Sequence, residues 1–220
     1  MTELHGKEAE NALGRAFSHL MAERKESSVA EHPAASYWNR GAQRVPSTTG
    51  AETLMDACDF EDITRALGID RPIDSVLDVG CGTGRVARHC DHYIGVDIAA
   101  DAVRYCKARG LDARLIEGPE HLLTSLGLPE APADFTLVLA MSVFTHIDAD
   151  ERQRYLEAFT RLTNLVLVDI IPGSGNGDVA LWTADTAQFE RSIAHCGWAI
   201  RHTYDRPSPE GVEHRYYLLD

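Results

Sequence analysis

The 220-residue sequence lacks several features that mark common classes of protein. It has no apolar run near the ~20 residues that a membrane span needs, and its N-terminal segment is charged from Glu3 onward, without the apolar core of a signal peptide. Basic residues are in the minority, since 21 basic against 34 acidic residues give a formal net charge of −13. This sign opposes binding to a phosphate backbone, so we expect neither a membrane nor a nucleic-acid partner.

Paired cysteines and familiar catalytic motifs are also absent. The five cysteines contain no C-x-x-C pair, and an odd number scattered over apolar segments is typical of a reducing cytoplasm, where we expect the protein. There is no H-E-x-x-H zinc pattern and no G-x-S-x-G serine-hydrolase turn. The donor-rich run 89–92 (HCDH) cannot aim four consecutive side chains at one metal, so the sequence predicts no metal site.

What the sequence does contain is a regular alternation of apolar runs and helical patterns from Ser75 onward. The runs SVLDV, YIGVD, ARLIE, DFTLVLA and LVLVDII are each followed by a helical pattern, at 84–90, 99–109, 119–126, 148–162 and 185–196. Such an alternation predicts a parallel sheet with helices on both faces. The last two runs, WAIRHTY and HRYYLL, are joined by a segment too short for a crossover helix, which predicts an antiparallel hairpin.

We therefore expect an α/β fold with a doubly wound, seven-stranded, mostly parallel sheet, an antiparallel C-terminal hairpin and a helical N-terminal cap. The cap is expected over residues 1–70 and the sheet domain over 71–220. Helical spacing at 4–25 and 52–67 brackets a Pro-, Gly- and Ser-rich segment at 26–50, and Gly68 suits the end of the second helix.

A glycine-rich turn joins the first apolar run to the pattern that follows it. The segment V76-L-D-V-G-C-G-T-G-R-V-A87 has glycines at 80, 82 and 84, which allow a tight turn and a close approach of backbone to a ligand. A dinucleotide fingerprint G-x-G-x-x-G would need glycine at 85, where the sequence has Arg85. The spacing argues against a nicotinamide or flavin enzyme.

This turn carries a resemblance to a known family. D78-V-G-C-G-T-G84 resembles motif I of the class I S-adenosylmethionine-dependent methyltransferases, and Y93-I-G-V-D-I98 resembles the motif that follows it. The resemblance is close over about residues 73–172. It implies that Asp97 binds both ribose hydroxyls, a role that suits a carboxylate because two acceptors face two vicinal donors. It also implies that Asp78 lies near the amino group of the methionine moiety; a turn or helix cap is the alternative. The residues implied at this part of the cofactor are Asp78, Gly80, Cys81, Gly82, Thr83, Gly84, Asp97 and Ile98.

Two later segments are placed by the same resemblance. Family members often have an acid after the third strand that contacts the adenine amino group, and here the sequence reads I116-E-G-P-E-H-L122, in which Pro119 has no N–H to donate. Glu117, Gly118 and Glu120 are the candidates for this contact. After the fourth strand, A140-M-S-V-F-T-H-I147 resembles the segment that lines the methionine end, which assigns Ala140 and Met141 to the cofactor.

The N-terminal segment holds further candidates. Family members commonly fold an N-terminal lid over the cofactor, so Arg40 would pair with the methionine carboxylate, while Tyr37 and Trp38 would close the pocket. The alternative is that these rings anchor the cap to the domain.

The resemblance implies methyl transfer from S-adenosyl-L-methionine to a small-molecule acceptor, a natural product or metabolite methylated on oxygen or nitrogen, with S-adenosyl-L-homocysteine as product. His146 is the first candidate for a general base or a residue that orients the acceptor; the alternative is a histidine that packs the start of the next helix. His32, His214 and Tyr216 are further candidates for the base. A protein or RNA methyltransferase and a noncatalytic cofactor-binding module remain open.

Overall fold

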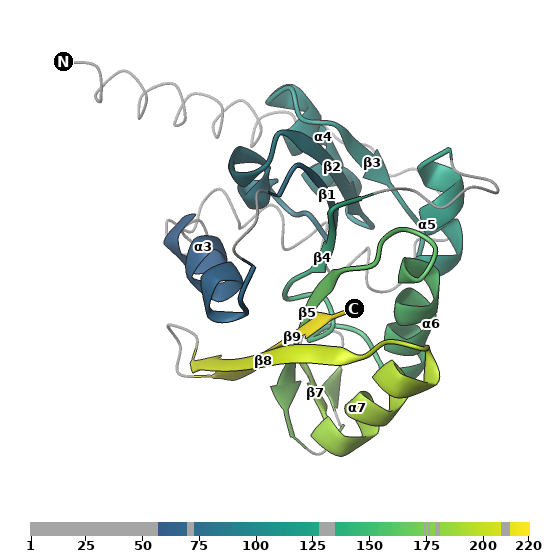
Figure 1. Ribbon diagram of the computed structural model, residues 1–220. Helices are drawn as coiled ribbons and strands as arrows, with labels where there is room; N and C mark the ends of the chain where they lie inside the picture. The colour runs from purple at the N-terminus through teal and green to yellow at the C-terminus, as the bar shows by residue number, and fades with distance from the viewer. Residues whose placement is uncertain are drawn as a thin grey trace.

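A computed structural model gives the architecture of the chain (Figure 1). It describes residues 57–69, 73–127, 135–173, 175, 177–178, 181–207 and 212–220. Most of the expected cap, with His32, Tyr37, Trp38 and Arg40, lies outside the described residues. Among the helices that are described, none is long and apolar enough to cross a membrane.

Five parallel strands form the centre of the sheet, in the order β3-β2-β1-β4-β5. They are β1 (Ser75–Val79), β2 (His92–Asp97), β3 (Ala113–Leu115), β4 (Leu137–Ala140) and β5 (Val166–Pro172). The strand order reverses between β1 and β4. In open α/β sheets a ligand binds at such a switch point, beyond the carboxyl ends of the strands.

The expected C-terminal hairpin is confirmed. β8 (Ile200–Pro207) and β9 (Glu213–Leu219) pair antiparallel, and β9 also runs antiparallel to β5, so these seven strands form the expected series. Two short strands were not expected. β6 (Gly177–Asp178) and β7 (Leu181–Ala184) form a small hairpin in which β7 runs parallel to the last residues of β5.

Helices follow the strands much as the periodicity predicts. They are α3 (Ala57–Ala66), η1 (Arg85–His89), α4 (Ala100–Ala108), α5 (Pro119–Ser125), α6 (Ala149–Phe159) and α7 (Thr186–His195). The side chain of Asp148 caps α6 and that of Asp185 caps α7 by accepting a backbone N–H, as short acidic side chains commonly do. The segment at 84–90 is a 3₁₀ helix and not an α-helix, because left-handed Gly84 precedes it and extended Cys90 ends it after five residues.

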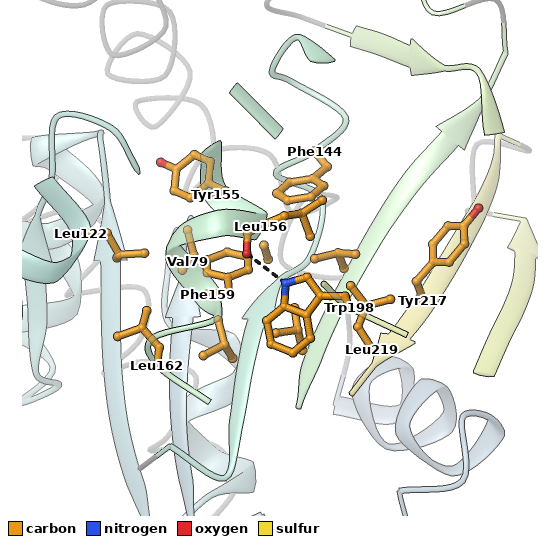
Figure 2. Close-up of a cluster of buried hydrophobic side chains, with 14 of the residues drawn as sticks. Val79, Leu122, Phe144, Tyr155, Leu156, Phe159, Leu162, Trp198, Tyr217 and Leu219 are labelled. Carbon is orange, nitrogen blue, oxygen red and sulfur yellow. Dashed lines mark hydrogen bonds between the residues drawn. The ribbon is translucent and has the colours of Figure 1, made fainter. Parts of the chain in front are cut away.

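Strand side chains alternate between two hydrophobic clusters, one on each face of the sheet. Leu77, Val138 and Val168 pack with α5, α6 and α7, whereas Val76 and Leu167, from alternate positions, face α3 and η1. Figure 2 shows the first cluster, in which the indole N–H of Trp198 donates to the Leu156 carbonyl at 2.9 Å. The sheet is therefore doubly wound, with helices on opposite faces (Figure 1).

Helix α3 belongs to the cover of the sheet. Its Phe60 and Ile63, with Leu67 just beyond its end, pack in the same cluster as the strand residues of that face. Gly68 follows with φ +72°, the left-handed conformation expected at the end of a helix. We call the side of the sheet covered by α3 and η1 the α3 face.

Candidate functional site

The glycine turn folds over the carboxyl end of β2. The backbone N–H groups of Gly80 and Cys81 both donate to the Val96 carbonyl, at 2.8 and 3.0 Å. Gly80 and Gly82 have φ of +70° and +52°, a left-handed conformation that glycine adopts without steric cost because it has no Cβ. The turn thus lies directly beside Asp97, the last residue of β2.

Asp97 is held by the turn and by its own strand end. Its Oδ2 accepts from the Gly82 N–H at 2.8 Å, and its Oδ1 accepts from the Ala99 N–H at 2.7 Å. Burial raises the pKa of this carboxyl, while the backbone N–H donors counteract the rise. A carboxylate has about four acceptor positions, so each oxygen can accept one further donor. The residue fits a ligand with two neighbouring hydroxyl groups, such as a ribose.

Asp78 is a buried carboxyl on β1 whose main partner is a tyrosine. The Tyr93 hydroxyl donates to Asp78 Oδ2 at 2.8 Å. Burial raises the pKa of Asp78 to about 7, against the opposing effects of the Tyr93 hydrogen bond and the charge of Arg85. A buried carboxylate gains most from a nearby cation. The ammonium group of an amino-acid moiety fits this requirement.

The side of the glycine turn that faces α4 is closely packed, and the Cys81 side chain is part of this packing. This side chain is buried with Cys106 and Val103 of α4. A Cβ on Gly95, which lies opposite Asp78 in the sheet, would come within 2.8 Å of the Cys81 sulfur. Only the backbone of Cys81 is therefore left to meet a ligand on the other side of the turn. The sequence analysis did not single out Gly95 or Tyr93, although both stand in the motif that contains Asp97.

The adenine candidates lie just beyond β3. The Ile116 N–H donates to the Asp97 carbonyl, which brings this segment to the edge of the turn. Glu117 is exposed and lies 3.6 Å from His121, and Glu120 forms an ion pair with Arg154. Both carboxylates thus have surface partners, and Ile98, between Asp97 and α4, is half-buried. The roles of these residues stay predictions.

The turn after β4 carries the remaining predicted residues. Ala140 is fully buried, and Met141 packs in the cluster of the α3 face. His146 is half-buried, and its backbone N–H donates to the Val143 carbonyl at 2.9 Å. Ser142 has φ +59°, the one positive φ of a non-glycine residue in the part of the chain that the structure describes. Strained backbone of this kind persists where surrounding contacts hold it.

The side chain of Asp169 holds the backbone of Ser142 in this conformation. The Ser142 N–H donates to Asp169 Oδ1 at 2.5 Å, and the other carboxylate oxygen lies 2.7 Å from Nδ1 of His214 on β9. Asp169 is fully buried, whereas 15% of the His214 side chain is exposed. Asp169 was not among the residues predicted from the sequence. An acid within the otherwise apolar run LVLVDII was the available signal, because a lone carboxylate in a central strand needs a partner.

Arg152 joins this turn to the unexpected hairpin. It is a buried residue on α6, its Nε donates to the Phe144 carbonyl at 2.7 Å, and its terminal nitrogens lie 3.5 Å from the Thr183 carbonyl of β7. Burial lowers the pKa of the guanidinium to about 10, so it stays charged at neutral pH. Arg152 thereby fixes the outer part of the turn that contains His146.

The alternation of side chains brings two carboxylates to the α3 face, and a third lies at the same end of the sheet. Asp78 and Asp169 each lie two positions from a residue that packs with α3, namely Val76 and Leu167, so both point to the α3 face. Asp97, bonded to the glycine turn at the end of β2, lies at the same carboxyl end of the sheet. The structure therefore gathers the predicted Asp78, Gly80–Gly84 and Asp97 at the switch point.

We expect Gly82→Val to abolish measurable binding of S-adenosylhomocysteine while the protein still folds. A Cβ on Gly82 would meet no described atom within 4 Å, so the side chain would project into the open side of the turn next to Asp97. The left-handed φ itself costs roughly 1–2 kcal/mol of stability for a residue with a Cβ. Calorimetry measures the affinity, and circular dichroism checks the fold.

Gly197→Val is the matched control, because Gly197 has φ +87°, also has open space around it, and follows the C-terminal end of α7. It should lose similar stability and keep its affinity. Equal affinity in the two variants would mean that the turn only connects a strand and a helix.

Comparisons with known proteins agree with this geometry. Residues 76–164 match the family model of the methyltransferase domain. Magnesium protoporphyrin IX methyltransferase (ChlM) from Synechocystis PCC 6803, solved with bound S-adenosylmethionine, aligns with a TM-score of 0.60 at 12% identity, over 87% of this chain and 99% of that one. The 1,6-didemethyltoxoflavin-N1-methyltransferase of Burkholderia thailandensis gives 0.60 at 16%, over 89% and 92%.

The same fold also occurs in a protein named for another reaction. The [4+2]-cyclase SpnF aligns with a TM-score of 0.54 at 16% identity, over 72% of this chain and 79% of that one. The likeness to these structures therefore establishes the Rossmann-like fold, and the reaction has to be argued from the residues of the site.

Proposed function

We propose that the chain is a class I S-adenosylmethionine-dependent methyltransferase, which the match of residues 76–164 to the methyltransferase-domain model supports, and that it methylates a small-molecule acceptor on oxygen or nitrogen. The observation that carries the proposal is the grouping of Asp78, Gly82 and Asp97 at the switch point of the sheet. The two buried carboxyls suit the cofactor. Asp97 has acceptor positions beyond those that the Gly82 and Ala99 N–H groups occupy, and Asp78 is a buried carboxyl that an ammonium group would stabilise.

In this proposal each residue has a limited task. Asp97 accepts the two ribose hydroxyls, and the backbone of the glycine turn approaches the amino-acid moiety, whose ammonium group Asp78 binds. Glu117, Gly118 and Glu120 border the adenine, and Ile98, Ala140 and Met141 supply apolar contact. When bound, the cofactor supplies a methyl group on a sulfonium. An acceptor atom held roughly 3 Å from the methyl carbon, in line with the carbon–sulfur bond, would displace the sulfur.

Two observations support a small acceptor over a macromolecule. The net charge of −13 disfavours RNA, and the described residues past the methyltransferase motifs form only the hairpins β6–β7 and β8–β9 with α7. The toxoflavin enzyme and ChlM are both named for small-molecule substrates. We also propose that residues 1–70, with Tyr37 and Arg40, complete the site, and that His146 orients the acceptor.

The test has two stages. Calorimetry should first show that the purified chain binds S-adenosylhomocysteine and not a nicotinamide dinucleotide. The chain is then incubated with S-adenosylmethionine and phenols, catechols and nitrogen heterocycles, including 1,6-didemethyltoxoflavin, and products are sought by mass spectrometry. Transfer to total RNA or protein from labelled cofactor, with none to small molecules, would overturn the choice of acceptor. Binding without transfer to any class would favour a noncatalytic module.

A further inference from the structure

A second polar cluster lies on the α3 face, away from the residues assigned to the cofactor. It consists of Asp169 on β5, His214 on β9 and the backbone N–H of Ser142 in the turn after β4. We propose that His214 is the general base that takes the proton from the methyl acceptor, with Asp169 as its positioning residue. The proposal rests on the methyl transfer proposed above.

The location of the pair suits an acceptor site. In the sheet, Asp78 lies level with Leu139 and Leu139 lies level with Leu167, so Asp169 is two strands across from Asp78 and two residues nearer the carboxyl ends. Two strand spacings are roughly 10 Å, which leaves room for a methyl group and a small acceptor between the two carboxylates. The strained turn at Ser142, which follows the cofactor candidates Ala140 and Met141, separates them.

The hydrogen bonding sets the state of the imidazole. Because Nδ1 faces a carboxylate that can only accept, the neutral ring carries its proton on Nδ1, and the lone pair is on Nε2. Among the described residues, Nε2 has no hydrogen-bond partner, and the ring is partly exposed. Tyr216, itself stacked on Tyr204, stacks on the ring with centroids 6.2 Å apart and restricts its rotation. The ring therefore points its basic nitrogen away from Asp169.

The lone pair of the acceptor oxygen or nitrogen forms the bond to the methyl carbon as the carbon–sulfur bond breaks, and the bonding pair stays on sulfur. The acceptor proton passes to Nε2 of His214, and the resulting imidazolium is stabilised by the Asp169 carboxylate. The Ser142 N–H keeps that carboxylate in place throughout. Release of the proton to water restores the neutral ring.

His214→Asn distinguishes a role as base from a role as a hydrogen-bond partner of Asp169. The asparagine amide can still donate to Asp169 but has no basic nitrogen. We expect it to fold and to bind S-adenosylhomocysteine within a few fold of the wild type. With a phenol that is un-ionised at neutral pH, kcat should fall by about 10²–10⁴-fold. With a dinitrophenol, which is ionised at the same pH, kcat should change little. An equal loss on both acceptors, or none on either, would overturn the role. His146→Ala is measured beside it, and a loss confined to that variant would assign the base to His146.

A measurement without acceptor tests the same proposal even where no phenol is methylated. The ¹⁵N-histidine spectrum of the protein bound to S-adenosylhomocysteine should show the proton of the His214 ring on Nδ1, beside Asp169, and none on Nε2. Asp169→Asn should move the proton to Nε2, because the amide can present a donor to Nδ1. A protonated Nε2 in the wild type would exclude His214 as the base. Failure of S-adenosylhomocysteine to bind at all would instead count against the proposed function.

Discussion

Replacing Asp97 with alanine should weaken binding of S-adenosylhomocysteine by about 2–4 kcal/mol, roughly 30- to 1,000-fold. Two charge-assisted hydrogen bonds to the ribose would be lost together. The turn would also lose an acceptor, since Gly82 donates to Oδ2 of this residue and Ala99 to Oδ1. Calorimetry on the folded variant measures the loss.

An analogue of the ligand distinguishes a direct contact between Asp97 and the ribose from the hydrogen bond by which Asp97 holds the glycine turn. Wild-type protein should bind 2′-deoxy-S-adenosylhomocysteine more weakly than the parent compound, because one hydroxyl no longer reaches the carboxylate. In Asp97→Ala the same deletion should have almost no further effect, as expected for two groups that contact each other. Losses that simply add would show that Asp97 shapes the turn without touching the ribose.

Asp78→Asn should change the pH dependence of stability while it weakens cofactor binding. The folded-state pKa of Asp78 is about 7 and the ordinary value is 3.8, so the folded protein holds this proton more tightly than the unfolded chain. Its effect on stability is therefore unfavourable, grows as the pH rises from about 4 to 7, and is complete above 7. Between pH 5 and pH 8 the wild type should lose about 2–3 kcal/mol more unfolding free energy than the variant.

Urea unfolding at the two pH values checks the prediction, and Tyr93→Phe is the informative companion. Removing the Tyr93 hydroxyl takes away a hydrogen bond that lowers the pKa of Asp78, so the pH-dependent loss should extend to higher pH. If Asp78 binds the ammonium group, complex formation at pH 6 should also release a proton, seen as an enthalpy that depends on the buffer. Identical pH profiles for Asp78→Asn and wild type would contradict the buried titration.

Much of the fold was predictable because the signals are local. Continuous apolar strands predicted the parallel sheet, and the short connection after Arg206 predicted the antiparallel pairing of β8 and β9. The glycine spacing and Asp97 predicted neighbours that the structure places at hydrogen-bond distance. In each case the residues of one element, or of two consecutive elements, are enough to predict the local structure.

Features that join distant segments were not predictable in the same way. The Asp169–His214 contact spans 45 positions, and no periodicity reports which histidine lies opposite a buried acid. The β6–β7 hairpin is too short for its alternation to stand out, and its parallel contact with β5 depends on tertiary packing. The 3₁₀ form of η1 likewise depends on how Gly84 leaves the turn.

The contacts of Arg152 have a consequence for attempts to change the acceptor by exchanging loops. The turn with His146 and the strand β7 share one buried guanidinium, through the carbonyls of Phe144 and Thr183. A grafted β6–β7 hairpin whose backbone moves the carbonyl of residue 183 away from Arg152 would deprive a buried charge of that acceptor. The turn after β4 and the β6–β7 hairpin therefore depend on each other. We expect a chimera to fold when it transfers both segments together with Arg152.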